Sequence, residues 1–134
     1  MRPTTTIKTF LVEDSAVIRD NLVATLEELA AVELLGDADE EQAALQALAA
    51  LPGRVDLLIV DIFLKKGSGL GVLRGARPLL PPQAMVVVLS NYATPDMRRR
   101  CLDLGADRVF DKSNEIEALI LFCRQLAAGA ASAG

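Results

Sequence analysis

Two short stretches of the chain are apolar at every position, and they restrict the folds that it can adopt. Residues 57–60 read Leu-Leu-Ile-Val, and residues 85–89 read Met-Val-Val-Val-Leu. A strand that is apolar on both faces lies inside a parallel sheet that helices cover on each side. The first of these strands is expected to extend over residues 55–62. Shorter apolar segments predict three flanking strands, at residues 7–12, 32–35 and 108–111.

Segments with helical spacing separate these strands. The first has apolar residues every three or four positions from Ile18 to Leu29, and Ser15 is placed to cap its first turn. Strict alternation of strand and helix with short connections predicts an α/β fold, with a doubly wound parallel sheet and helices on both faces. The same spacing predicts four further helices, at residues 40–51, 70–77, 97–104 and 116–126.

The length and composition of the chain fit one globular domain. Of its 134 residues, 51% are hydrophobic and 24% are charged, and the formal net charge is −4. An acidic chain is not expected to bind nucleic acid or an anionic membrane. No apolar run is long enough for a signal peptide or a membrane span, so a cytoplasmic protein is expected. We expect one domain over residues 1–134, with a core of about residues 7–127 and a frayed tail at 128–134.

The chain contains no histidine. This excludes Ser-His-Asp and Cys-His catalysis, imidazole metal ligands and a phosphohistidine carried by the chain itself. Its two cysteines, Cys101 and Cys123, fall within predicted helices. They are predicted to be buried thiols, because a disulfide is not expected in a cytosolic protein and two thiols without histidine do not form an ordinary zinc site.

Polar residues stand where the predicted strands end. The five are Glu13 and Asp14 after the first strand, Asp61 at the third, Ser90 at the fourth and Lys112 at the fifth. Ligands of doubly wound sheets bind outside the carboxyl ends of the strands. If the first and third strands are neighbours, three carboxylates converge, and their repulsion calls for a cation. Oxygen ligands favour Mg²⁺, and Lys112 supplies a further positive charge. One acid at a strand end is usually a helix cap or a solvated turn, whereas the whole set indicates a site.

In their order along the chain, these residues resemble the receiver domains of two-component response regulators. Four stretches carry the resemblance: Phe-Leu-Val-Glu-Asp-Ser at 10–15, Asp-Leu-Leu-Ile-Val-Asp at 56–61, Gly-Leu-Gly-Val-Leu at 69–73 and Leu-Gly-Ala-Asp at 104–107. The resemblance covers about residues 7–127. It implies a flavodoxin-like (βα)5 fold with strand order 2-1-3-4-5. It also implies a stand-alone, phosphorylatable receiver.

The resemblance assigns a role to each polar residue. Asp61 is implied to be the nucleophile that takes a phosphoryl group from a sensor histidine kinase or a histidine phosphotransfer protein. Asp14, Asp61 and the backbone carbonyl of Phe63 are implied to hold Mg²⁺, with Glu13 acting through bound water. Lys112 would balance charge on the phosphoryl oxygens. The chain is not expected to be an enzyme beyond self-catalysed phosphorylation and dephosphorylation.

The resemblance also implies a route by which the signal leaves the site. Ser90 would hydrogen-bond the phosphoryl group and couple it to the surface of the fourth helix, fifth strand and fifth helix. Arg98, Arg99 and Arg100 lie on that fourth helix, where they form either a solvated face or a docking surface for a protein partner. The sequence ends where an output domain would begin. Signalling by protein contact or phosphate relay is therefore expected, rather than DNA binding.

Three positions depart from the family pattern. Ser113 follows Lys112 where proline is usual, Val109 stands where an aromatic residue is usual, and Asn91 follows the fourth strand where a small residue is usual. These departures affect the conformational readout rather than the acid set. A second interpretation therefore stays open, a protein-interaction module of the same fold that phosphorylation does not regulate. A phosphatase with an aspartyl nucleophile is excluded, because it needs a second acid where Phe63 stands.

Two segments beside the predicted site carry smaller signals. The glycine-rich segment at residues 67–71 hints at a phosphate-binding loop, but it fits neither G-x-G-x-x-G nor the P-loop pattern. It is predicted to be a loop that enters a helix. The family resemblance places Phe63 and Tyr92 beside the path of a water toward Asp61. Their size, and the lack of a polar group on Phe63, predict a long-lived phosphorylated state.

Overall fold

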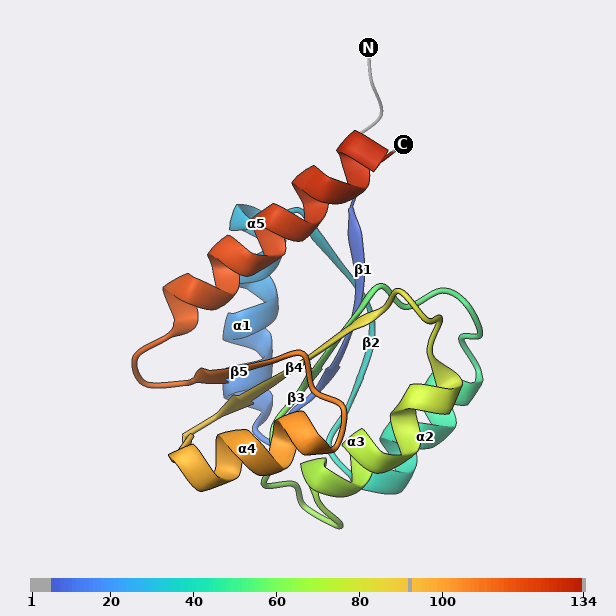
Figure 1. The fold of residues 1–134 in the computed structure, drawn as a ribbon, viewed down its shortest axis with the longest axis vertical. Helices are drawn as coiled ribbons and strands as arrows, with labels where there is room; N and C mark the ends of the chain where they lie inside the picture. The colour runs from blue at the N-terminus through green and yellow to red at the C-terminus, as the bar shows by residue number, and fades with distance from the viewer. Residues whose placement is uncertain (1–5, 92, 134) are drawn as a thin grey trace.

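One parallel sheet of five strands forms the centre of the protein (Figure 1). The computed structural model describes residues 6–91 and 93–133 of the chain, and side chains as far as residue 129. The strands run in the order β2-β1-β3-β4-β5. The expected doubly wound fold and its strand order are therefore confirmed. The strands are β1 (Ile7–Val12), β2 (Val32–Ala38), β3 (Leu57–Val60), β4 (Met85–Ser90) and β5 (Arg108–Asp111).

In the described part of the chain, five α-helices cover the sheet, with α1 and α5 on one face and α2, α3 and α4 on the other (Figure 1). One hydrophobic cluster lies beneath α1 and α5 and includes Leu26 and Phe122; the other includes Leu48 and Val72. Along these residues no helix is both long enough and apolar enough to cross a membrane. The helices are α1 (Ala16–Leu29), α2 (Glu41–Ala49), α3 (Gly69–Ala76), which continues into a 3-10 turn (Arg77–Leu79), α4 (Pro95–Asp103) and α5 (Ile116–Ala133).

The central strand β3 is held from both faces, as its sequence predicts. All four of its side chains are 0% exposed. Leu57 and Ile59 belong to the cluster beneath α1 and α5, while Leu58 and Val60 belong to the opposite one. Burying a side chain of this size contributes about 1.5–3 kcal/mol relative to leaving it exposed. The carboxyl end of β3 is therefore anchored by packing on both sides.

Some element boundaries differ from the predicted ones. β2 continues past residue 35 to Ala38, whose carbonyl accepts the N–H of Glu13 (2.9 Å). α3 begins at Gly69, because the Ser68 hydroxyl accepts the N–H of Leu70 (3.0 Å). α5 runs to Ala133, so residues 128–133 continue the last helix where a frayed tail was expected. The alanines of this segment have the highest helix propensity and extend the helix beyond the sheet.

Both cysteines are free buried thiols, as predicted. Burial raises the pKa of Cys123 to about 12. Burial also raises the pKa of Cys101, against a smaller opposing effect of Arg100. Both thiols are therefore protonated at neutral pH, and neither is activated as a nucleophile.

Candidate functional site

The predicted acidic residues meet at one edge of the sheet because of the register between β1 and β3. Val12 pairs with Val60, so the residues that follow these two strands leave the sheet side by side. The N–H of Asp61 donates to the carbonyl of Val12 (2.9 Å) and ties the two strand ends together. Glu13 and Asp14 thus lie next to Asp61, as the sequence predicted.

The strands β4 and β5 bring the remaining two predicted residues to the same edge. Ser90 ends β4, is fully buried and pairs with Asp111 across the two strands. The N–H of Lys112 donates to the carbonyl of Ser90 (3.0 Å), which fixes where the lysine leaves β5. The side chain of Lys112 then extends back to the acidic residues.

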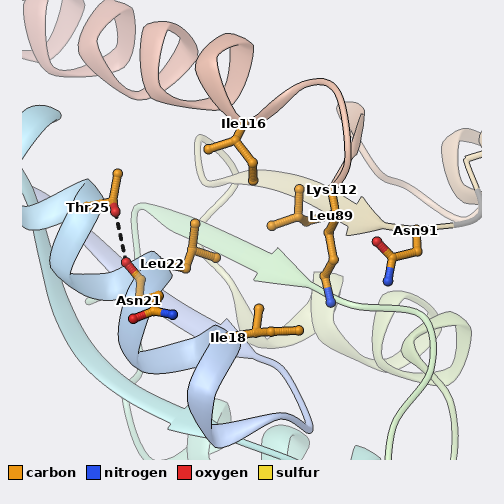
Figure 2. Close-up of a pocket in the computed structure, with 8 residues that line it drawn as sticks. All are labelled: Ile18, Asn21, Leu22, Thr25, Leu89, Asn91, Lys112 and Ile116. Atoms are coloured by element: carbon orange, nitrogen blue, oxygen red, sulfur yellow. Dashed lines mark hydrogen bonds between the residues drawn. The ribbon is translucent and has the colours of Figure 1, made fainter.

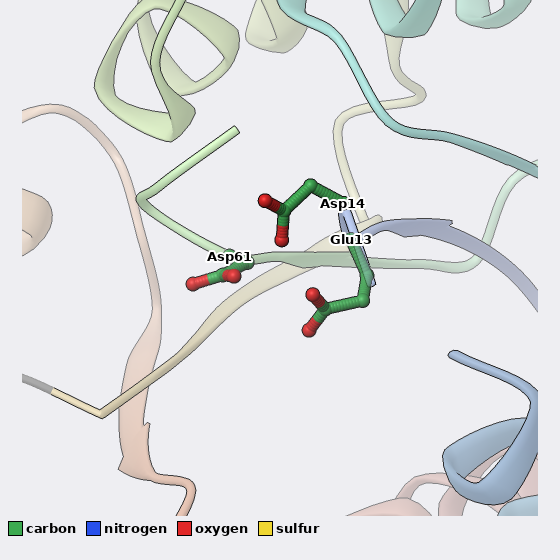
Figure 3. Close-up of side chains that lie close together, drawn as sticks. All are labelled: Glu13, Asp14 and Asp61. Atoms are coloured by element: carbon green, nitrogen blue, oxygen red, sulfur yellow. The ribbon is translucent and has the colours of Figure 1, made fainter. Parts of the chain in front are cut away.

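The three acidic side chains form one cluster (Figure 3). One carboxylate oxygen from each of Glu13, Asp14 and Asp61 lies within 4.8 Å of the others. Glu13 and Asp61 are only 1% and 6% exposed, whereas Asp14 is partly exposed. The N–H of Ser15 donates to Oε2 of Glu13 (3.1 Å), and the Ser15 hydroxyl caps α1 as predicted. The start of α1 thereby fixes the orientation of one member of the cluster.

Lys112 is the positive charge in this cluster. Its Nζ lies 2.5 Å from Oε1 of Glu13 and 3.1 Å from Oδ2 of Asp61, and all three side chains are less than a tenth exposed. Burial opposes the charge on Lys112, but the hydrogen bond to Glu13 and the charge of Asp61 outweigh it and raise the pKa of Lys112. Burial also raises the pKa of Glu13, although Lys112 opposes this rise. The ammonium is therefore firmly protonated between two buried carboxylates.

The donor set of the cluster fits a hard divalent cation. Three carboxylates and one ammonium leave two negative charges uncompensated, which one divalent cation balances. Carboxylate oxygens are ligands that Mg²⁺ and Ca²⁺ prefer. Among the described residues, this is the one group of acidic, histidine or cysteine side chains close enough to hold a metal ion. The carbonyl of Phe63, in the loop that follows Asp61, remains a predicted further ligand.

The turn after Lys112 accounts for one departure from the family pattern. The N–H groups of Ser113 and Asn114 donate to Oδ1 of Asp111 (2.7 and 3.2 Å). A proline in place of Ser113 has no N–H to give. Across the described residues no peptide bond is cis, which includes the bond between Lys112 and Ser113. Serine thus lets the side chain of Asp111 hold this turn.

The three arginines of α4, which were expected to form either a solvated face or a docking surface, are not equivalent. Arg98 is half-buried, and its guanidinium donates to the carbonyls of Ala93 (3.0 Å) and Val109 (2.9 Å) and to the Glu115 carboxylate (2.6 Å). Arg99 is exposed and lies 3.5 Å from Asp96, which is exposed as well. Arg98 is therefore a structural residue that joins α4, β5 and the start of α5, and Val109 lies in the core beside it.

A cavity beside Lys112 was not predicted from the sequence. Figure 2 shows it between the start of α1, the end of β4 and the turn before α5, with a volume of about 340 Å³. Its lining combines apolar side chains with side-chain amides. The partly exposed Ile18 lies across from Leu89 and Ile116, and Asn21 and Asn91 lie near the edges. The sequence gives no clear sign of this cavity, because helical spacing assigns its apolar lining residues to the core.

The sequence matches the model of the response regulator receiver domain family over residues 9–123. Three solved structures share the fold. A response regulator from Burkholderia pseudomallei, solved with a phosphorylated aspartic acid, a calcium ion and citrate, has a TM-score of 0.76 at 22% identity, over 93% of this chain and 71% of that one. The receiver domain of the putative response regulator NarL from Mycobacterium tuberculosis gives 0.75 at 22% identity, over 92% and 98%. A LuxR-family response regulator from Aurantimonas sp. SI85-9A1 gives 0.81 at 18% identity, over 92% and 86%.

These matches define a class of signalling protein, the two-component response regulators. The chain belongs to their receiver domain family. The resemblance inferred from the strand-end residues is therefore confirmed.

Proposed function

We propose that this receiver domain accepts a phosphoryl group on Asp61 and acts as a phosphorylation-dependent switch. The observation that carries the proposal is the placement of Asp61 itself. It directly follows the central strand β3, a carboxylate oxygen of it lies within 4.8 Å of those of two other acids, and it contacts the buried ammonium of Lys112 at 3.1 Å. A carboxylate held in this way is oriented for attack on an incoming phosphoryl group.

The residues around Asp61 fit the charge changes of phosphoryl transfer. A carboxylate oxygen of Asp61 forms a bond to phosphorus while the bond from phosphorus to the donor breaks, and the electron pair of that bond leaves with the donor. Lys112 supplies a fixed positive charge beside the transferred oxygens. Ser90, at the end of β4, would donate a hydrogen bond to one of them and so register the presence of the group.

Mg²⁺ is the cofactor that we propose for this site. Asp14, Asp61 and the carbonyl of Phe63 would hold it, and Glu13 would contact it through water. When bound, the ion would balance negative charge on the phosphoryl oxygens. The similar structure from Burkholderia pseudomallei contains a calcium ion as well as a phosphorylated aspartic acid, which is in keeping with a divalent cation as the cofactor of such a domain.

The donor and the downstream target are proposed to be proteins. A sensor histidine kinase or a histidine phosphotransfer protein would supply the phosphoryl group, since the chain has no histidine to carry one. The phosphorylated domain would then signal through protein contacts on the face of α4, β5 and α5. We infer no nucleic-acid or membrane binding and no reaction beyond transfer and hydrolysis of this one group.

Labelling with a small phosphodonor tests the proposal. Acetyl phosphate with Mg²⁺ is expected to add one phosphoryl group to the wild-type protein and none to Asp61→Asn, as measured by intact mass. Omitting Mg²⁺ and adding a chelator should abolish labelling. Asp103→Asn is the matched control, because Asp103 is an exposed acid at the far end of α4, and this variant should label as the wild type does. Labelling that survives in Asp61→Asn, or a wild type that takes no label, would favour the unphosphorylated interaction module instead.

A further inference from the structure

The glycine-rich segment before and within α3 allows a close packing of helices that the proposed function does not explain. Gly67, Gly71 and Gly75 recur every fourth residue, and they face α2, which lies beside α3 (Figure 1). A Cβ at Gly71 would overlap the carboxylate of Glu41, and a Cβ at Gly75 would come within 2.9 Å of Leu45. The two helices approach closely because these three positions carry no side chain.

The carboxylate of Glu41 occupies the recess that these glycines leave. Its Oε1 accepts the N–H of Ser68 (3.0 Å), and the Glu41 N–H donates to the carbonyl of Lys66 (3.0 Å). Gly67 has a φ of +78°, in the left-handed region that favours glycine, and a side chain there would also collide with Glu41. Glu41, the first residue of α2, thus both donates a hydrogen bond to the end of the loop that follows Asp61 and accepts one from it. We call residues 61–68 the β3–α3 loop.

The contact continues from this loop to the phosphoacceptor. The N–H of Gly69 donates to the carbonyl of Ile62 (2.8 Å), and a Cβ at Gly69 would overlap the carbonyl oxygen of Asp61. A continuous series of contacts therefore links Glu41, through Ser68 and Gly69, to the backbone of Asp61. The recess cannot serve as a phosphate cradle, since a second anion there would face the Glu41 carboxylate directly.

We propose that Glu41 is a positioning residue for phosphoryl transfer: its carboxylate, seated against glycine backbone, fixes the β3–α3 loop and with it Asp61 and the carbonyl of Phe63. This inference rests on the proposed function of Asp61. Glu41 touches neither the acceptor carboxylate nor the donor. It acts on the maximal rate of transfer through the geometry of the loop, because small displacements of reacting groups are costly.

Three substitutions on α2 separate positioning from packing. Glu41→Ala removes the acceptor for the Ser68 N–H and is expected to lower the maximal rate of labelling by saturating acetyl phosphate about tenfold, less than the roughly hundredfold that a 1 Å displacement can cause. Glu41→Gln keeps an oxygen at that place and is expected to restore most of the rate. Leu45→Ala is the matched control, because it loosens the same helix pair one turn away and should leave the rate close to wild type while lowering the melting temperature.

Amide hydrogen exchange gives a readout that does not depend on labelling. The N–H groups of Ser68 and Gly69 should exchange faster in Glu41→Ala and not in Leu45→Ala. Equal rates of labelling in Glu41→Ala and Leu45→Ala, or a Glu41→Gln protein as slow as Glu41→Ala, would overturn the inference. A wild type that takes no label would overturn the proposed function and this inference with it, so the two failures are distinguishable.

Gly71→Ala tests the same contact from the other side. Its methyl group would displace the Glu41 carboxylate, so labelling should slow as it does in Glu41→Ala. Adding Gly71→Ala to Glu41→Ala should cause no further loss of rate, because the contact is already absent. Rate losses that simply multiply in the double variant would show that the two residues act independently and would overturn the inference.

Discussion

The two sides of Asp61, the proposed phosphoacceptor, are held in different ways. The β3–α3 loop is fixed by contacts against glycine backbone, since Gly69 lies against the carbonyl of Asp61 and the Glu41 carboxylate lies against Gly71. On the other side, the side chain of Arg98 ties Ala93, just before α4, to β5 and the start of α5. Arg98 bonds Ala93, and its ion pair with Glu115 joins side chains that are 36% and 35% exposed.

This difference indicates which side of the site can move. The closest of these contacts, at Gly69 and Gly71, leave no room for a water between the atoms that meet. By contrast, water can replace a half-exposed ion pair at little cost, because such pairs contribute only about 0–1 kcal/mol. We therefore expect the β3–α3 side to act as a rigid frame for the proposed phosphoryl transfer. The α4 side, which begins just after Ser90, is expected to be the side that responds to it.

The largest expected effect comes from a substitution that displaces the β3–α3 loop. In Gly69→Ala the new Cβ would overlap the carbonyl oxygen of Asp61 and lie 2.7 Å from Cα of Ile62. Both neighbours are backbone atoms that β3 anchors, so the loop must shift. The maximal rate of labelling by acetyl phosphate is expected to fall about a hundredfold, as a displacement near 1 Å can cause.

A glycine elsewhere in the chain provides the control for this change. At Gly129, in α5, no described atom lies within 4 Å of the position a Cβ would take. Gly129→Ala should label at the wild-type rate and gain up to about 1 kcal/mol of stability, since alanine favours a helix. If Gly69→Ala also labelled at the wild-type rate, the β3–α3 loop would not be the rigid frame described above.

The second effect concerns stability on the α4 side. Arg98→Ala removes hydrogen bonds to Ala93, Val109 and Glu115 and is expected to lower the free energy of unfolding by about 2 kcal/mol. Arg99→Ala is the control, because its partner Asp96 is 89% exposed, and it should cost less than about 0.5 kcal/mol. Urea unfolding of both variants measures the difference. If both variants lost the same free energy of unfolding, Arg98 would contribute no more to stability than a solvated arginine does.

The third effect concerns an exposed side chain of the β3–α3 loop. Phe63 lies within the β3–α3 loop and is 54% exposed, so replacing its ring should change stability little. Phe63→Asn introduces a polar group that can orient a water toward the phosphorylated Asp61. The lifetime of the phosphorylated state is expected to shorten about threefold, equal to about 0.6 kcal/mol. Tyr92, the second residue predicted to shield this path, lies outside the described residues.

Decay of labelled protein after removal of acetyl phosphate measures this lifetime. Phe63→Leu is the control, because it keeps an apolar side chain and should retain the long lifetime. A wild-type decay that is already fast, and that neither variant alters, would show that Phe63 does not control access of water.

The sequence predicted the fold and the acidic site because both depend on local signals. A run such as residues 57–60 is apolar wherever it lies, and an acid that follows a parallel strand reaches the carboxyl edge of the sheet by topology alone. The links that hold the loops are different. Glu41 and Ser68 are 27 residues apart, and Arg98 and Glu115 are 17 apart. Neither spacing has a periodic signature, so only the packed structure pairs them. The four-residue repeat of Gly67, Gly71 and Gly75 was the one available hint.

The smallest expected effect is the pH dependence of the Arg98–Glu115 pair. The hydrogen bond from Arg98, with a further one from the N–H of Asp111, holds the pKa of Glu115 below its ordinary value. A carboxyl group with a lowered pKa in the folded protein contributes stability above its unfolded pKa, near 4.5, and loses it as the pH falls through the folded value. Because the pair is partly exposed, the contribution is expected to be about 0.5 kcal/mol.

Glu115→Gln isolates this contribution, since glutamine keeps an acceptor for Arg98 and for the Asp111 N–H but carries no charge. The wild type should be more stable than Glu115→Gln by about 0.5 kcal/mol at pH 7. The two proteins should converge as the pH falls below the ordinary pKa of a glutamate, because the wild-type side chain then becomes neutral as well. Urea unfolding of both proteins between neutral and acidic pH measures the gap, and other carboxyl groups cancel in the difference. A gap that stays constant down to the most acidic pH would mean that the charge of Glu115 contributes nothing, and that hydrogen bonding alone holds the α4 side.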